Sequence, residues 1–169
     1  MERVYIIICF IAYLTGTAYG VFEVPEEDKS YLCVNIEKEK VLFPAPYDNF
    51  KQIAYNNIKS EAYCMFLGIF SIGILSMLYA FYNGFLLGCA IAHYKKMLTF
   101  YEILHSTLPH SSEIIAIVIS CYAGYMLSNS LLLQKKISYK KIAYAIILCI
   151  VITVISAALE SYVSMSPIR

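Results

Sequence analysis

The sequence predicts an all-α membrane protein, a single bundle of about five transmembrane helices with one long loop outside the membrane. The 169 residues are 60% hydrophobic and only 15% charged, and the mean hydropathy is +0.64. These values are too apolar for an ordinary soluble domain of this size. Polar segments also divide the chain into apolar runs, most of them long enough to cross a bilayer. The net charge of +1 provides no basic face for nucleic acid.

Residues 4–22 form the first apolar run, directly after Glu2 and Arg3. Two interpretations fit this pattern. The run is either a signal peptide cleaved after small residues near Gly20, or a first transmembrane helix. We expect an uncleaved signal-anchor helix.

Residues 23–60 form the only long polar stretch, which we expect to be an extracytoplasmic loop. Two short apolar segments, 30–36 and 40–43, predict a small hairpin within it. From Asp48 onward the apolar residues have helical spacing, with Asp48 as a candidate N-cap. This end of the loop is therefore predicted to be a short amphipathic helix that leads into the next span.

The second and third spans are predicted at 62–81 and 85–105, as a helical hairpin. Asn83 and Gly84 lie between them, and both residue types tolerate the positive φ values found in tight turns. We therefore expect the turn at this dipeptide. Pro109 then breaks the chain before the fourth span.

The fourth and fifth spans are predicted at 113–133 and 142–163, and they are joined by a basic loop at 134–141. Four lysines in this loop place it in the cytoplasm under the positive-inside rule. Counting back through the spans gives an N-in, C-out topology, with which Arg3 agrees. Lys95 and Lys96 disagree, unless their side chains snorkel to the interface.

The six cysteines form no CxxC or Cys/His pattern, and five of them stand alone in apolar runs. We expect these to be small buried residues rather than disulfide partners or metal ligands. The sequence also has no nucleophile motif and no phosphate-binding loop. No enzymatic activity, metal or cofactor is predicted.

The predicted topology brings polar residues from three helices to one end of the bundle, in the outer leaflet: Asn56, Asn57, His110, Glu113 and Glu160. One interpretation is structural: these residues cap helices and form hydrogen bonds between helix ends. Alternatively they line a cavity for a proton, a cation or a polar group of a partner, since ionisable groups inside a membrane are functional by default. A third reading, a His/Glu metal site, lacks a second histidine at suitable spacing.

Several motifs resemble those of the stage II sporulation protein M family. They are the Asn56-Asn57 pair, Asn83-Gly84-x-x-Leu87-Gly88, Leu108-Pro109-His110-x-x-Glu113, Ala123-Gly124, and the Ala-rich stretch 157–163 with its single Glu160. The chain departs from the family pattern at Ser111, where the family usually has glycine.

The resemblance implies a non-catalytic membrane subunit in a bacterial cytoplasmic membrane. Sporulation members of the family act as scaffolds for cell-wall-degrading partners, and other members accompany ABC-type transporters or bacteriocin gene clusters. We therefore expect a scaffold for a complex that acts on the cell wall or on an exported peptide. The alternative is a transport component whose His/Glu cluster binds cargo or couples protons. The expected partners are the lipid bilayer and other membrane proteins, such as a cell-wall hydrolase complex or an ABC transporter. Nucleic acid is not expected as a partner. The sequence does not decide whether the protein forms a homo-oligomer.

Overall fold

The protein is a bundle of helices in which consecutive helices run in opposite directions, in a computed structural model that describes residues 2–23, 46–95, 99, 101, 103, 107, 110–136 and 138–162. The helices are α1 (Glu2–Phe22), α3 (Pro46–Ser71), α4 (Ile74–Tyr94), α6 (His110–Leu131) and α7 (Tyr139–Tyr162). This confirms the all-α prediction for the described residues. The hairpin predicted at 30–43 lies outside them.

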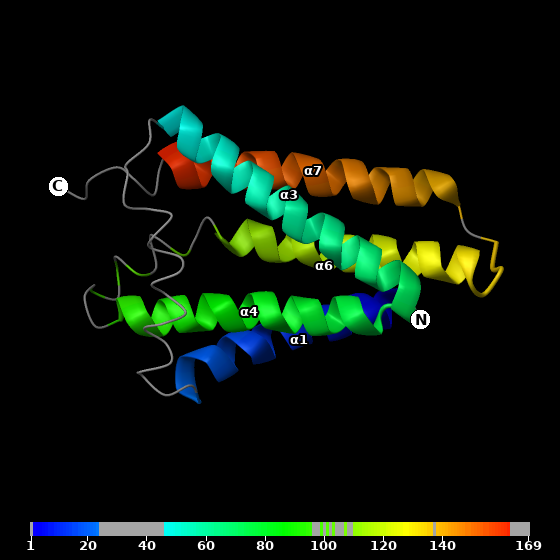
Figure 1. The fold of residues 1–169 in the computed structure, drawn as a ribbon, viewed down its shortest axis with the longest axis horizontal. Coiled ribbons are helices and arrows are strands. Elements are labelled where there is room, and N and C mark those ends of the chain that lie inside the picture. Colours follow the sequence, from blue (N-terminus) through cyan, green and yellow to red (C-terminus); the bar gives the residue numbers. More distant parts are fainter. Residues whose placement is uncertain are drawn as a thin grey trace.

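The helices run between two ends of the bundle (Figure 1). We call them the Glu2 end, where α1 and α7 begin and α3 turns into α4, and the His110 end, where α3 and α6 begin. Four helices, α1, α4, α6 and α7, are long and apolar enough to cross a membrane. The fifth, α3, also runs from one end to the other, but its first half is polar.

The turn predicted at Asn83 and Gly84 is wrong, because both residues lie inside α4. The chain reverses at Ile72 and Gly73 instead, with φ values of 54° and 88°. The Gly73 amide donates a hydrogen bond to the Gly68 carbonyl at 3.0 Å, a closure typical of a helix C-terminus. The spans expected at 62–81 and 85–105 are displaced accordingly. The short amphipathic helix and the second span form one continuous helix, α3, which begins at Pro46, before the expected Asp48 cap.

Glycine at position 84 is explained by helix packing rather than by a turn. The motif Gly16-x-x-x-Gly20 of α1 faces Gly84-x-x-x-Gly88 of α4, and a Cβ atom on any of the four would overlap the backbone of the other helix. Small residues at this spacing let membrane helices approach closely. The α1–α4 pair has the most extensive contact in the bundle.

The start of α1 is fixed to the α3–α4 turn by Tyr5. Its hydroxyl group donates a hydrogen bond to the Gly73 carbonyl at 2.8 Å and also bonds to Ser76 Oγ at 2.8 Å. Its ring stacks on that of Tyr125 of α6, with the ring centroids 4.3 Å apart. One side chain therefore ties three parts of the chain together at the Glu2 end.

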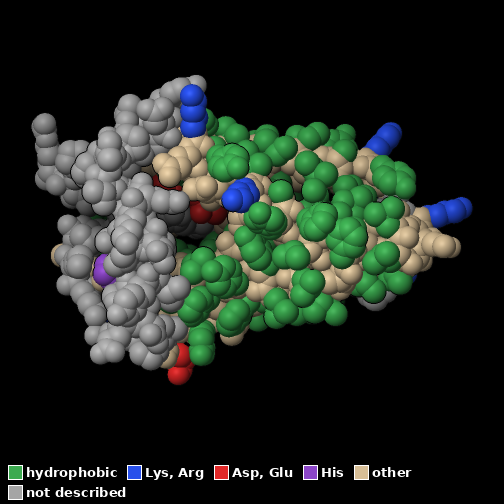
Figure 2. Space-filling model, viewed as in Figure 1, with side chains coloured by type: hydrophobic (Ala, Val, Ile, Leu, Met, Phe, Trp, Pro, Cys, Tyr) green, Lys and Arg blue, Asp and Glu red, His purple; other side chains and the backbone are tan. Residues whose placement is uncertain are grey.

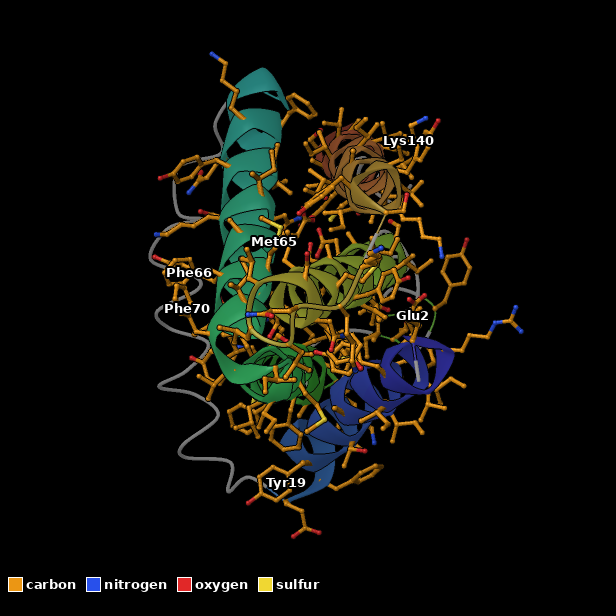
Figure 3. All side chains as sticks on the ribbon, turned by 90° about the vertical axis from the view of Figure 1, so that its right-hand side faces the viewer. Glu2, Tyr19, Met65, Phe66, Phe70 and Lys140 are labelled. Carbon is orange, nitrogen blue, oxygen red and sulfur yellow. The ribbon has the colours of Figure 1, made fainter. Side chains whose placement is uncertain are left out.

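Helix α6 occupies the centre of the bundle, where it contacts α1, α3, α4 and α7. Buried around it are Cys9, Cys64 and Cys121, and the burial predicted for the cysteines is confirmed for all five that the structure describes. Cys33 lies outside the described residues. Phe66 and Phe70 project outward from α3, whereas Met65 faces inward (Figure 3).

Hydrophobic side chains cover the middle of the visible face (Figure 2). Many large apolar residues of α1, α4 and α7 are exposed there or elsewhere on the bundle surface. A soluble monomer rarely exposes so much apolar surface, but lipid tails solvate it well. Together with the four apolar helices, this surface marks a membrane protein.

Candidate functional site

Polar side chains of α3, α6 and α7 meet inside the bundle toward the His110 end. Asn57 of α3 donates a hydrogen bond from its side-chain nitrogen to Oε1 of Glu113 of α6, at 2.5 Å. Both side chains are partly buried. The structure therefore brings together two of the residues that the sequence grouped in one polar cluster.

Glu61 lies one helical turn beyond Asn57 on the same side of α3, and it was not part of the predicted cluster. Its side chain is only 6% exposed. Thr153 of α7 donates a hydrogen bond to Oε1, and Cys149 of α7 donates to Oε2 at 3.1 Å. The carboxyl group is thus held between two side chains of a neighbouring helix.

Further hydrogen bonds join α6 to α7 beside this carboxyl group. The Cys149 sulfur lies 2.9 Å from Ser120 Oγ and 3.2 Å from the Ala116 carbonyl oxygen. Nearer the His110 end, Ser112 and Ser156 share a hydrogen bond of 2.8 Å. The polar contacts therefore form a track from the middle of α7 toward the His110 end, between apolar helices.

The remaining predicted site residues occupy different places. Glu160 lies one turn beyond Ser156 on α7 and is half-buried, at the same end of the bundle. His110 is the first residue of α6, and its side chain lies outside the described part of the structure. Asn56 is exposed on α3.

The residues predicted as a turn serve the helix packing. The Asn83 side chain accepts a hydrogen bond from Ser60 Oγ at 3.1 Å and donates one to the Tyr79 carbonyl at 2.8 Å, and so joins α4 to α3. Gly84 and Gly88 lie against α1, as described above. These three residues are therefore separate from the Glu61 and Glu113 carboxyl groups.

The two carboxyl groups, Glu61 and Glu113, are close enough to interact electrostatically. Each accepts at least one hydrogen bond from another helix, so each joins α3 to a neighbour. Hydrogen bonds between side chains are stronger where water is excluded. Within the described residues, no group of three or more His, Cys, Asp and Glu side chains is arranged to hold a metal ion.

One sequence signal pointed to Glu61. It follows Asn57 by four residues, so the two side chains share a helix face once this region is one helix. The prediction divided the region into a surface helix and a span beginning at residue 62, which left Glu61 at a boundary. The continuous α3 removes that boundary and places the residue in the core.

One of three comparisons with known proteins found a match. The family model described as stage II sporulation protein M matches residues 6–165, nearly the whole chain. No curated protein and no solved structure matches the chain. The match covers all of the polar track described above. The chain belongs to the stage II sporulation protein M family.

Proposed function

We propose that the protein is a non-catalytic subunit of the bacterial cytoplasmic membrane that holds together a complex acting on the cell wall or on an exported peptide. The observation that carries this proposal is the set of bonds that fix α3 against α6 and α7. The side chains of Asn57 and Glu61 form hydrogen bonds with the neighbouring helices α6 and α7. A rigid α3 suits a scaffold, because it would present its first turns to a partner in a constant position.

In this proposal all five helices cross the membrane, with the N-terminus inside and the C-terminus outside. Five described basic residues lie at the Glu2 end, Arg3, Lys135, Lys136, Lys140 and Lys141, against three toward the His110 end, Lys51, Lys59 and Lys95. This excess supports the orientation. Helix α3 would cross with Asn57 and Glu61 facing other helices, where polar groups in membranes are tolerated, and with the long side chains of the exposed Lys51 and Lys59 extending toward the His110 end. The His110 end then lies outside the cytoplasm.

The first turns of α3 are the surface we expect a partner to contact. Tyr55 is 66% exposed there, and Asn56 beside it is exposed as well. Tyrosine is enriched in protein interfaces because its ring supplies apolar area and its hydroxyl group a hydrogen bond.

The test compares two exposed tyrosines at opposite ends of the bundle. Tyr55→Arg should disrupt the complex, whereas Tyr139→Arg, at a residue 70% exposed at the Glu2 end, should leave it intact. The measurement is the apparent mass of the complex on native gels after mild extraction from host membranes. If Tyr55→Arg and Tyr139→Arg both leave an assembly of unchanged mass, the proposed surface is wrong; if wild-type protein runs alone, the scaffold proposal is wrong.

A second function, a transport component that couples protons, is favoured by one observation. Glu61 and Glu113 are two interacting carboxyl groups inside a bundle of apolar helices, the setting in which proton relays occur. Glu61→Gln separates the two functions, since glutamine keeps the size and accepts the Thr153 bond but cannot release a proton. A scaffold would still restore a deletion strain with this variant. A proton-coupled transporter would fail to do so while its complex remained assembled.

A further inference from the structure

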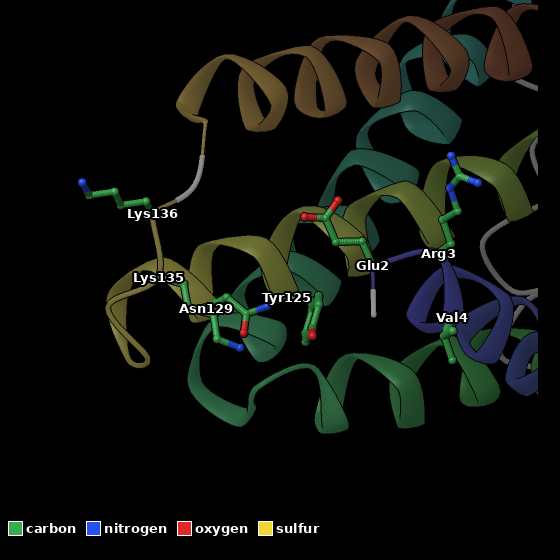
Figure 4. A pocket seen from close by; sticks show the side chains of 7 residues that line it. All are labelled: Glu2, Arg3, Val4, Tyr125, Asn129, Lys135 and Lys136. Carbon is green, nitrogen blue, oxygen red and sulfur yellow. The ribbon is translucent and has the colours of Figure 1, made fainter.

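A recess at the Glu2 end is lined by residues from the start of α1, from the last turns of α6 and from the segment that follows α6 (Figure 4). Its volume is about 670 Å³. This is within the usual range for small-molecule sites, roughly 300–1,000 Å³. The recess is far along the bundle from the Glu61 carboxyl group and uses none of the residues of the polar track.

The charge of this recess is positive. Arg3, Lys135 and Lys136 line it together with one acidic residue, Glu2. The Glu2 carboxylate already accepts a hydrogen bond from the Tyr122 hydroxyl group at 2.9 Å. The first turn of α1 adds the positive end of the helix dipole. Three cations against one partnered carboxylate favour an anionic ligand.

Asn129 provides a second, independent feature on the wall of the recess. Its side chain is only 6% exposed, and its Oδ1 atom has no hydrogen-bond partner among the described residues. A buried carbonyl oxygen that accepts no hydrogen bond destabilises the folded protein, so such a group indicates that a donor from a bound molecule completes the site. The ligand that completes it must bring an O–H or N–H donor.

The backbone holds a cation next to this amide. Gln134 has a φ of 50°, which turns the chain back after α6. The Lys135 amide then donates a hydrogen bond to the Asn129 carbonyl at 3.0 Å. In Figure 4, Lys135 lies beside Asn129, whereas the Arg3 and Lys136 side chains extend away from Asn129 in different directions. The backbone of a lysine is thus held next to Asn129.

We propose that this recess binds the head group of an anionic phospholipid that carries hydroxyl groups, of the phosphatidylglycerol type. The phosphodiester meets the cations, and a head-group hydroxyl donates to Asn129 Oδ1. The recess opens where the apolar helices end, which is the depth of lipid head groups, and basic pockets between helices bind such groups. The proposal does not depend on the scaffold or transport role of the complex.

The first experiment is native mass spectrometry of the purified full-length protein with phosphatidylglycerol or phosphatidylcholine added. We expect one phosphatidylglycerol molecule to be retained with at least about tenfold preference. The combined variant Arg3→Gln, Lys135→Gln, Lys136→Gln should lose that preference. The matched control, Lys140→Gln with Lys141→Gln, changes two exposed lysines outside the recess and should keep it. No preference in the wild type, or equal loss in the control, overturns the proposal.

The second experiment tests the hydroxyl contact. Wild-type protein should prefer phosphatidylglycerol over phosphatidic acid, whose head group is the phosphate alone, and Asn129→Leu should remove this preference. The unfolding temperature of each variant shows that it is folded; if Asn129→Leu fails to fold, Asn129→Ala, which also removes the acceptor oxygen but adds no branched side chain, takes its place. An unchanged preference in the folded variant contradicts the assigned contact. Displacement of the lipid by excess inorganic phosphate would show a simple anion site and overturn the lipid proposal.

Discussion

The Thr153 hydroxyl group of α7 donates a hydrogen bond to the Glu61 carboxyl group of α3, and both side chains are buried. The same hydroxyl group lies 3.0 Å from the Cys149 carbonyl of its own helix. The bond to Glu61 is therefore a link between helices, whereas the bond to Cys149 is local. Apolar helix faces pack about equally well against lipid and against other helices. Side-chain hydrogen bonds between helices, such as that from Thr153 to Glu61, therefore specify which helices are neighbours.

Thr153→Val should destabilise the protein by about 1–3 kcal/mol, because valine has the same shape but leaves a buried carboxyl oxygen without its donor. Stability can be followed by the reaction of a thiol-specific dye during heating. The buried cysteines react only as the bundle opens. Replacement of Cys33 by serine removes the one thiol outside the described residues.

Thr15→Val is the matched control for this prediction. Thr15 is exposed and bonds only to the Ile11 carbonyl of its own helix, at 2.8 Å, so the change should stay within about 0.5 kcal/mol. The double variant Thr153→Val, Glu61→Leu should be more stable than Thr153→Val alone, since it leaves no unpaired carboxyl oxygen and the Cys149 thiol keeps the Ala116 carbonyl as an acceptor. Equal effects of Thr153→Val and Thr15→Val would show that the link between helices contributes nothing.

The sequence was sufficient to predict that polar residues of several helices lie at one end of the bundle. It was not sufficient to predict which side chains form hydrogen bonds with each other. Counting spans placed Asn57 and Glu113 at one end of the bundle, and the structure joins them directly. The partners of Glu61 were not predictable in this way. They are Thr153 and Cys149, some 90 residues later in the chain. The packing of all the helices decides which face of α7 lies against α3. The local sequence of α7 does not predict this face.

The turn was mispredicted for a related reason. Asn83-Gly84 has the local chemistry of a turn, but Gly84 is required by the backbone of α1, which lies far away in sequence. The true reversal includes Ile72 at a φ of 54°, an unusual conformation for a β-branched residue. Local propensity favours a continuing helix at Ile72, and the Tyr5 bond to Gly73 stabilises the reversal from another helix.

Gly84→Ala should destabilise the bundle by about 1–3 kcal/mol, because the added Cβ overlaps the Tyr13 carbonyl and forces α1 away from α4. The dye assay should give a lower unfolding temperature. Ala143→Val, on the exposed face of α7, adds more volume but meets lipid and should have little effect. A Gly84→Ala protein as stable as wild type would mean that the close α1–α4 contact is not required.

Tyr5→Phe should destabilise the protein by about 1–3 kcal/mol, the usual effect of losing two hydrogen bonds. The change removes the bonds to the Gly73 carbonyl and to Ser76 but keeps the ring that stacks on Tyr125. Tyr5→Leu should cost more, because the stacking is lost as well. If the two variants unfold at the same temperature, the stacked ring contributes no stability beyond that of the hydroxyl group.

The proposed orientation makes the final prediction, which concerns a cysteine at each end of the bundle. Ser138→Cys lies at the Glu2 end and Glu23→Cys at the His110 end, and both residues are exposed. In intact cells that also carry Cys33→Ser, a membrane-impermeant maleimide should label Glu23→Cys but not Ser138→Cys. Permeabilised cells should allow both to react, which excludes burial as the cause of protection. The opposite labelling pattern would reverse the topology. The lysines beside Ser138 would then face outward, against the positive-inside rule.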